Sequence, residues 1–158
     1  MIIDTHMHAF PFLGSGKEAG WESEVERVAN WQTLIYGFAR GKPIEERGSA
    51  STLPDINFRV GEMGRFEWTE DGQDYYFQFM PPSMQNQESS PKFVIAQLDH
   101  AGVDLAVLQN AKSYGKLNEY FSAAVKQSPD RFVGLLEIDE LVANQEEEIN
   151  RLCHAVNE

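Results

Sequence analysis

The sequence contains little cysteine and no long apolar run. Cys153 is the only cysteine among 158 residues, so the chain cannot form an internal disulfide, which fits a reducing compartment. No apolar stretch approaches the roughly 18 residues of a membrane span, and no basic segment precedes a short apolar one as in an export signal. We therefore expect a cytoplasmic protein.

Positive charge is also scarce. Lys and Arg number 13 against 25 Asp and Glu, so the formal net charge is −12. A surface of that sign repels nucleic acid and anionic membranes, and neither is expected as a partner. The hydrophobic content of 42% and the charged content of 24% are those of a globular protein. A length of 158 residues suffices for one domain but is short for two.

Three segments have the pattern of strands in an α/β protein. Residues 2–8 predict a short buried strand at the start of the chain. The nearly continuous apolar runs 103–110 and 131–139 are typical of parallel strands covered on both faces. The predicted order is strand, long insertion, helix, strand, helix, strand, helix.

Helical patterns flank the two later strands. Ser90 can cap the first helix, Pro91 occupies its first position and Gly102 ends it. Apolar residues at helical spacing indicate two further helices, and Cys153 on the apolar face of the last one is expected to be buried. These residues are Leu117, Tyr120, Phe121, Ala124 and Val125 in one helix and Ile149, Leu152, Cys153 and Val156 in the other.

Residues 12–90 differ in composition and are interpreted as an insertion after the first strand. They hold 12 of the 18 aromatic residues. Ser23 and Glu26 match a capping box at the start of a helix, which Gly41 and Pro43 should stop. Its expected apolar face consists of Val25, Val28, Gln32, Ile35 and Ala39.

A hairpin is predicted later in the same insertion. The segments RFEWTE and QDYYFQF flank Asp71 and Gly72, a dipeptide that favours a two-residue turn between antiparallel strands. The stretch from Met80 to Met84 contains two prolines and is expected to form a loop.

The segment IDTHMH, residues 3–8, ends the first strand with two histidines one residue apart. Alternate residues of a strand point the same way, so Asp4, His6 and His8 should share one face. Two imidazoles at this spacing can converge on one metal ion, and Asp4 can orient a ligand through a hydrogen bond. The alternatives are an ordinary polar strand end for the histidines and capping of a backbone amide for Asp4.

A catalytic zinc usually has three protein ligands, and the third is not evident. His100 lies in the last turn of a predicted helix, where a histidine usually faces solvent. His154 lies off the apolar face of the last helix, and Cys153 is expected to be buried. None of the three is assigned to the metal.

Polar residues after the later strands would lie at the carboxyl end of the sheet, where α/β proteins place their sites. Lys112 could hold a substrate anion and Tyr114 could contact a substrate, while Arg59 and Arg65 in the insertion could clamp a carboxylate. The alternative for each is an ordinary exposed residue. The full set at the strand ends is Asn110, Lys112, Ser113 and Tyr114 after one strand and Asp139 after the next.

Two stretches of the sequence carry a family resemblance. They are IIDTHMHAFP and QLDHAGVDLAVLQNAKSYGKLNEYFSAAVKQSPDRFVGLLEID, and the likeness covers residues 1–10 and roughly 91–157. Together they resemble the amidohydrolase-related family, which includes aminocarboxymuconate-semialdehyde decarboxylase and related metal-dependent hydrolases. The His-x-His alone is a weak signal, because other phosphoesterases and nucleases begin the same way. The AGVD, NEY and PDRFVG elements are more specific.

The resemblance implies the amino-terminal part of a distorted (β/α)8 TIM-type barrel, about three parallel strands, with a long insertion after the first. It implies that His6 and His8 hold a divalent metal, most often zinc. It also implies hydrolysis or non-oxidative decarboxylation of a small carboxylated or cyclic substrate. The family's other metal ligands and its catalytic histidine lie on later strands that have no counterpart here, so the catalytic residues are unknown and this chain alone is expected to be inactive.

A second function stays open beside the enzyme. The chain could be a truncated, non-catalytic homologue that acts as a binding or assembly module. Since an open sheet of three strands leaves an edge unpaired, we expect either a homo-oligomer or a separate chain that completes the barrel.

Overall fold

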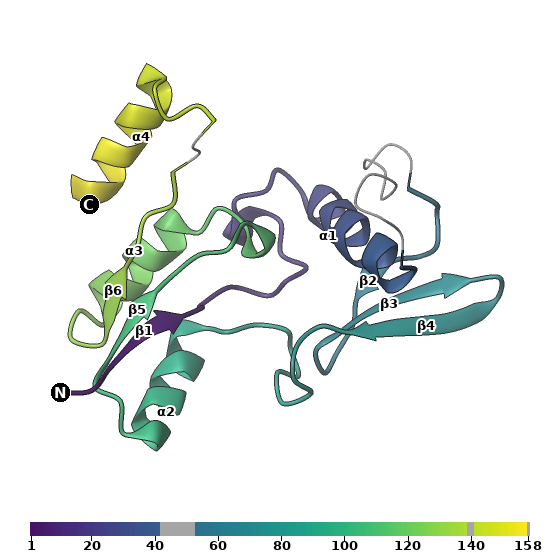
Figure 1. The fold of residues 1–158 in the computed structure, drawn as a ribbon, viewed down its shortest axis with the longest axis horizontal. Coiled ribbons are helices and arrows are strands. Elements are labelled where there is room, and N and C mark those ends of the chain that lie inside the picture. Colours follow the sequence, from purple (N-terminus) through teal and green to yellow (C-terminus); the bar gives the residue numbers. More distant parts are fainter. Residues whose placement is uncertain (42–52, 139–140, 158) are drawn as a thin grey trace. The chain divides into compact units, whose positions relative to one another are not determined.

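A computed structural model describes residues 1–41, 53–138 and 141–157 of the chain (Figure 1). The chain divides into two compact units, residues 1–10 with 89–158 in one and residues 11–88 in the other. Within the described ranges, no helix has the length and apolar character needed to cross a membrane.

The first unit is a parallel three-stranded sheet with helices in its connections. Its strands lie in the order β1-β5-β6, and both neighbouring pairs are parallel. The mixed α/β class and the parallel sheet are therefore confirmed. The elements are β1 (Ile3–Met7), α2 (Pro91–Ala101), β5 (Leu105–Leu108), a 3-10 turn η4 (Lys112–Tyr114), α3 (Asn118–Gln127), β6 (Phe132–Gly134) and α4 (Glu146–Asn157) (Figure 1).

Helix α2 begins and ends where the sequence predicts. The Ser90 hydroxyl oxygen accepts a hydrogen bond from the backbone N–H of Phe93 at 3.3 Å, and Pro91 fills the first position. Gly102 follows the last turn with φ +70°, a left-handed conformation that glycine adopts without steric cost. These local signals place the helix directly before β5.

One face of the parallel sheet is covered by the helices of its connections. Ala106 and Leu108 of β5 and Phe132 of β6 are each at most 1% exposed. Connections between neighbouring parallel strands are right-handed, so α2 and α3 lie on the same face of the sheet. The residues that these helices bury are Val94, Leu98, Phe121 and Ala124.

The opposite face is not covered by any described helix. Leu105 and Val107 are only half-buried, and Val133 is 44% exposed. In β1, Ile3 is 45% exposed and the strand has no fully buried residue. The expectation that residues 2–8 form a buried strand and that the later strands are covered on both faces is therefore wrong for this chain.

The pairing of β1 with β5 contains an irregularity that shifts its register. Asp4 pairs with Ala106 and Met7 with Leu108, so three steps along β1 match two along β5. An extra residue of this kind breaks the strict alternation of side chains. The alternation that predicts a common face for Asp4, His6 and His8 therefore does not hold between Asp4 and Met7.

The last helix departs from its expected burial. Ile149 is 46% exposed, Val156 is 68% exposed and Cys153 is exposed, so the predicted burial of Cys153 is wrong. The physical reason is that no described element packs over this apolar face. Arg151 anchors the helix from its polar side by donating to the Glu137 backbone oxygen at 2.9 Å.

The second unit packs one long helix on an antiparallel sheet. The strands lie in the order β2-β3-β4, and Asp71 and Gly72 form the two-residue turn between β3 and β4 with φ of +52° and +74°. The hairpin is therefore confirmed. The elements are a 3-10 turn η1 (Lys17–Ala19), α1 (Glu24–Ala39), β2 (Arg59–Val60), β3 (Arg65–Glu70) and β4 (Gln73–Gln78).

Helix α1 has the predicted ends and a partly different buried face. The Ser23 hydroxyl accepts from the Glu26 N–H at 3.2 Å, and Gly41 follows the helix with φ +66°, while Pro43 lies outside the described residues. Of the expected apolar face, Gln32 and Ile35 are buried and Val28 is half-buried, so the prediction is right in part. It is wrong for Val25, which is 80% exposed, and for Ala39, which is also exposed. The buried side chains of α1, which pack on the sheet, are those of Arg27, Trp31, Gln32, Ile35 and Tyr36.

Aromatic rings fill the core of this unit. Trp31 and Phe66 are fully buried with ring centroids 4.8 Å apart, and the Trp31 indole N–H donates to the Leu13 backbone oxygen at 2.8 Å. The buried guanidinium of Arg27 lies 4.6 Å from the Trp31 ring and 5.3 Å from the Trp21 ring. Burial lowers the pKa of Arg27 to about 10, because the charged form loses its hydration.

Candidate metal-binding site

His6 and His8 meet at the carboxyl end of β1. Their Nε2 atoms lie 3.1 Å apart, and their ring centroids are separated by 4.9 Å at an interplanar angle of 89°. The two rings therefore lie on the same side of the strand, as their spacing predicts. His6 is exposed and His8 is half-buried, so the meeting point of the two nitrogens is open to solvent.

The residue that fixes the His8 ring is Gln109, directly after β5. The His8 Nδ1 atom lies 2.7 Å from the Gln109 backbone oxygen. Gln109 is itself held twice on β1, because its backbone N–H donates to the Met7 oxygen at 2.9 Å and its side-chain amide donates to the Thr5 oxygen at 2.6 Å. Sequence reasoning missed Gln109, because its contact with His8 depends on the pairing of β1 with β5 and no local pattern marks it.

This bond determines which nitrogen of His8 carries a proton. A carbonyl oxygen can only accept, so in the neutral ring Nδ1 carries the hydrogen and Nε2 presents a lone pair. Without a metal ion, the N–H at His6 Nε2 then donates to His8 Nε2 across the 3.1 Å contact. The lone pair at His8 Nε2 is also the group that a metal ion would bind.

Asp4 supports the backbone of this segment and not a histidine ring. Its Oδ1 atom accepts a hydrogen bond from the His6 backbone N–H at 2.9 Å. Of the two alternatives derived from the sequence, backbone capping is the one that the structure contains. The carboxylate thereby helps to hold the irregular stretch of β1 between Asp4 and Met7.

Aromatic rings from two segments pack beside His8. Tyr114 lies 5.2 Å from the His8 ring and stacks on Phe10 at 4.3 Å with an interplanar angle of 3°. Phe10 is buried and Tyr114 is half-buried. Burial raises the pKa of the Tyr114 phenol above its ordinary value, so the hydroxyl stays protonated to higher pH.

A second polar cluster lies at the carboxyl ends of β5 and β6. The Asn110 side-chain amide donates to the Gly115 oxygen at 2.6 Å and to the Glu137 carboxylate. Asn118 closes the cluster by accepting from the Glu137 N–H and donating to the Glu137 backbone oxygen, both at 2.9 Å. These bonds tie the loop after β6 to the start of α3, which is a structural role.

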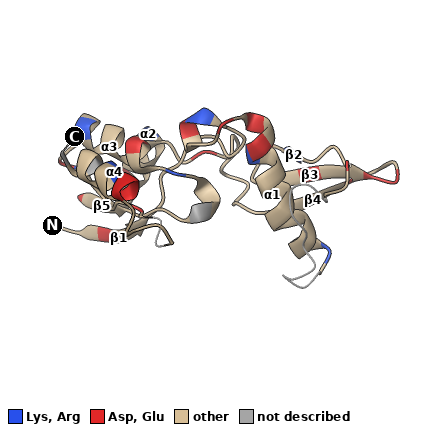
Figure 2. Ribbon diagram, turned by 90° about the horizontal axis from the view of Figure 1, so that it is seen from above, with Lys and Arg blue, Asp and Glu red and all other residues tan. Residues whose placement is uncertain are grey.

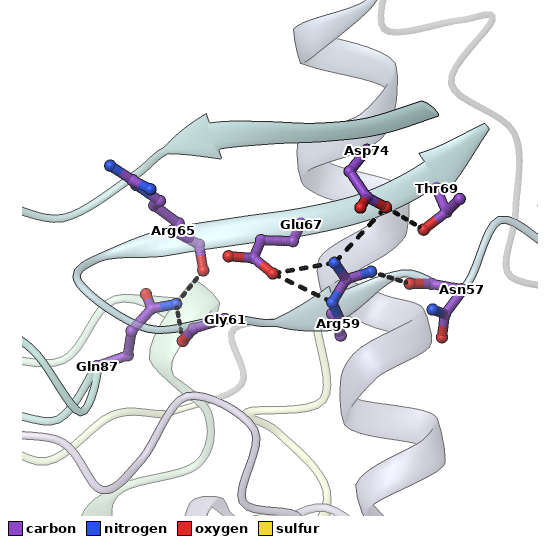
Figure 3. Close-up of polar contacts among 8 residues, drawn as sticks. All are labelled: Asn57, Arg59, Gly61, Arg65, Glu67, Thr69, Asp74 and Gln87. Atoms are coloured by element: carbon purple, nitrogen blue, oxygen red, sulfur yellow. Dashed lines mark hydrogen bonds and ion pairs between the residues drawn. The ribbon is translucent and has the colours of Figure 1, made fainter. Parts of the chain in front are cut away.

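The two arginines proposed to clamp a carboxylate belong to the second unit and have partners of their own, of which Figure 3 shows those of the Arg59 side chain. Arg59 contacts the Glu67 carboxylate with Nε at 3.1 Å and Nη2 at 3.0 Å, across the β2–β3 pair. Arg65 donates to Gln78 at 3.3 Å and lies over the Tyr76 ring at 4.4 Å. Because Nε and Nη2 of Arg59 both already contact the Oε2 atom of Glu67, Arg59 is unsuited to clamp a second carboxylate.

Several other residues predicted from the sequence supply no further metal ligand beside His6 and His8. His100 is exposed in the last turn of α2, as expected, and His154 is exposed on α4. Lys112 and Ser113 lie in the turn after β5. The Lys112 side chain and the whole of Asp139 are outside the described part of the chain. In the ranges that the structure describes, no three His, Cys, Asp or Glu side chains are grouped to hold a metal ion.

The histidine pair by itself fits two ligands of one zinc ion. With Zn–N bonds of about 2.0–2.1 Å in a tetrahedral site, two ligand nitrogens are roughly 3.3 Å apart. The observed 3.1 Å requires only a small opening of the pair. The carbonyl bond to Nδ1 is the usual support of a metal-bound imidazole, so the donor chemistry also fits.

The sequence matches no known family model and no curated protein. The resemblance to the amidohydrolase-related family is therefore a hypothesis that rests on the quoted residues alone.

Proposed function

We propose that this chain carries part of the active site of a metal-dependent hydrolase or non-oxidative decarboxylase, acting on a small carboxylated or cyclic substrate. The observation that supports this most is the His6–His8 pair, whose Nε2 atoms lie 3.1 Å apart at the end of a parallel strand. His8 is additionally held by the Gln109 carbonyl, as metal-bound histidines are. Two converging imidazoles, one of them oriented by a carbonyl, favour a metal site over two unrelated polar side chains at a strand end.

We further propose that the three parallel strands correspond to the first strands of a distorted (β/α)8 barrel. The support is their order β1-β5-β6, with α2 directly before β5, α3 before β6, and both helices on one face. In such a barrel the other face lines the interior, which agrees with the apolar, half-covered side chains of Leu105, Val107 and Val133. His6 and His8 lie at the carboxyl end, where barrel enzymes place their sites.

In this proposal the chain's own residues have distinct roles. His6 and His8 hold a divalent metal, most often zinc, which when bound supplies a Lewis acid for a substrate carbonyl or an activated water. The Gln109 carbonyl keeps the His8 lone pair directed at the ion. Tyr114 and Phe10 form an apolar wall beside His8, suited to an uncharged part of a cyclic substrate.

A non-catalytic binding or assembly module is the second candidate. The observation that favours it is the count of ligands, because the described residues offer two histidines and no third group at the same point. A zinc site that works in hydrolysis has three protein ligands. Measurement of turnover separates the two candidates.

The experiment compares the chain with His8→Ala and with His100→Ala, a matched control that removes an exposed histidine of the same unit. Titration calorimetry with Zn²⁺ should show about one ion per chain, with an affinity lowered at least about tenfold by His8→Ala and unchanged by His100→Ala. A panel of carboxylated and cyclic substrates, followed by mass spectrometry with Zn²⁺ present, should show no more than trace turnover, because two histidines leave a zinc ion short of a third protein ligand, and His8→Ala should abolish that trace. Equal affinity of all three proteins for zinc would contradict the metal site. Measurable product formed at equal rates by all three would contradict catalysis at this site.

A further inference from the structure

Strand β4 of the second unit has an exposed outer edge. β4 is the last strand in the order β2-β3-β4, and in the described part of the chain no strand pairs with its other side. Its six residues pair with β3 without a register shift. Five of the six are exposed, including Tyr75 and Tyr76 at 36% and 59%.

The register defines which backbone groups of β4 point outward. The Phe79 N–H donates to the Gly64 oxygen at 2.9 Å, one position beyond the pair Arg65–Gln78. Hydrogen-bonded and non-hydrogen-bonded pairs alternate in an antiparallel ladder. The backbone N–H and C=O groups of Phe77, Tyr75 and Gln73 therefore also point toward β3. The N–H and C=O groups of Asp74, Tyr76 and Gln78 therefore point away from the sheet.

This edge has none of the features that usually prevent strands from pairing with other chains. Residues 73–78 contain no Lys, Pro or Gly, and their pairing with β3 has no bulge. The single charge, Asp74, is already engaged, since its carboxylate accepts from the Thr69 hydroxyl at 2.7 Å and lies 4.0 Å from Arg59 (Figure 3). Pro81 and Pro82 end the available edge soon after β4.

We infer that β4 pairs with β4 of a second copy of this chain in antiparallel fashion, with Tyr76 opposite the same residue of its partner. This register lets the outward groups of Asp74, Tyr76 and Gln78 form about six main-chain hydrogen bonds. It places Asp74 opposite Gln78 and Tyr75 opposite Phe77. The edge is thus complementary to itself, with aromatic pairs at the centre and no like charges facing each other.

Charge opposes this association at longer range. Each copy carries −12, and the acidic residues Glu70 and Asp71 lie at the tip of the hairpin (Figure 2). Repulsion between exposed charges is screened by salt, whereas main-chain hydrogen bonds and aromatic contacts are not. The dimer is therefore stronger at 0.5 M than at 0.05 M NaCl.

Cross-linking of the full chain tests the register. Tyr76→Cys in a Cys153→Ser background brings two thiols together at a backbone separation of about 5.5 Å, which a disulfide can span. Gln73→Cys in the same background is the matched control, because its two copies would lie about 20 Å apart. Mild oxidation should produce a disulfide dimer of Tyr76→Cys at least tenfold faster than of Gln73→Cys. Equal rates would overturn the inferred register.

Light scattering coupled to size-exclusion chromatography tests the association itself. Tyr76→Lys places two ammonium groups opposite each other and should shift the chain to monomer, whereas Tyr76→Phe should leave the mass unchanged. Circular dichroism and urea unfolding show whether both variants fold. A wild-type chain that stays monomeric at both salt concentrations and at millimolar protein would overturn the inference, as would a folded Tyr76→Lys variant that still dimerises. This result is independent of any metal bound by His6 and His8.

Discussion

His8 and Gln109 are joined across the neighbouring strands β1 and β5 of the parallel sheet, with Nδ1 of the imidazole 2.7 Å from the Gln109 backbone oxygen. They are 101 residues apart in the chain. The acceptor is a backbone atom that follows β5, so it is positioned by the sheet and not by the rotamer of a side chain. The orientation of His8 is thus a consequence of the β1–β5 pairing.

The aromatic stack beside His8 should stabilise the fold through the Tyr114 ring and not through its hydroxyl. Tyr114→Ala removes a ring that stacks on buried Phe10, and we expect a loss of about 2 kcal/mol in the free energy of unfolding. Tyr114→Phe keeps the stack and should cost less than about 0.5 kcal/mol. Urea unfolding measures both. Equal losses for the two variants would show that the hydroxyl, and not the ring, stabilises this segment.

Burial of Tyr114 should be visible in an alkaline titration. Its pKa is raised, so the folded chain keeps this proton at a pH where the unfolded chain has lost it. The contribution to stability is therefore complete below the ordinary value of 10.0 and is lost as the pH rises through the folded value. Absorbance at about 295 nm should show that Tyr114→Phe removes a component that ionises above the ordinary tyrosine value of 10.0. Removal of a component that ionises below that value would contradict the assignment.

Two glycines with similar backbone conformation should respond differently to alanine. Gly64 has φ +78°, and an added Cβ would lie 2.2 Å from the Met80 backbone oxygen. Gly72 has φ +74° with nothing within 4 Å of that position. Gly72→Ala should cost about 1 kcal/mol from backbone strain alone, and Gly64→Ala at least about 2 kcal/mol more. Thermal unfolding compares them, and equal costs would show that the turn at Gly64 rearranges easily.

The ion pair between Arg59 and Glu67 should matter little for stability. Both side chains are partly exposed, at 38% and 29%, so solvent screens the pair. Glu67→Gln should lower the free energy of unfolding by no more than about 1 kcal/mol, and less at high salt. A larger or salt-independent loss in urea unfolding would show that this pair is effectively buried.

Local signals in the sequence were sufficient for the ends of α2 and for the hairpin turn, whereas the strand predicted over residues 131–139 extends only over Phe132–Gly134. Ser90, Pro91 and Gly102 act through backbone geometry within one or two turns, and so do Asp71 and Gly72, which explains why α2 and the hairpin are predicted well. The spacing of His6 and His8 likewise predicts their convergence, which the structure contains although an irregularity of β1 includes His6. Each of these features depends on the chain immediately around it.

Features that depend on distant contacts were not predictable in the same way. The buried face of α1 is decided by which rings the sheet offers, so Arg27 and Trp31 are buried while Val25 is exposed. The apolar runs around β5 and β6 resemble strands covered on both faces, but coverage depends on neighbours that the run itself does not specify. Gln109 supports His8 through pairing between strands 101 residues apart, which no local pattern reveals.

The most direct test of the metal site is an NMR titration of the histidine side chains with Zn²⁺, using ¹⁵N-labelled protein and long-range proton–nitrogen correlation. Before zinc is added, neutral His8 should be the Nδ1–H tautomer, because of its bond to Gln109. With one equivalent of zinc, Nε2 of both His6 and His8 should shift to metal-bound values, while His100 and His154 stay unchanged. Zinc shifts at His100 or His154 with none at His6 and His8 would contradict the account.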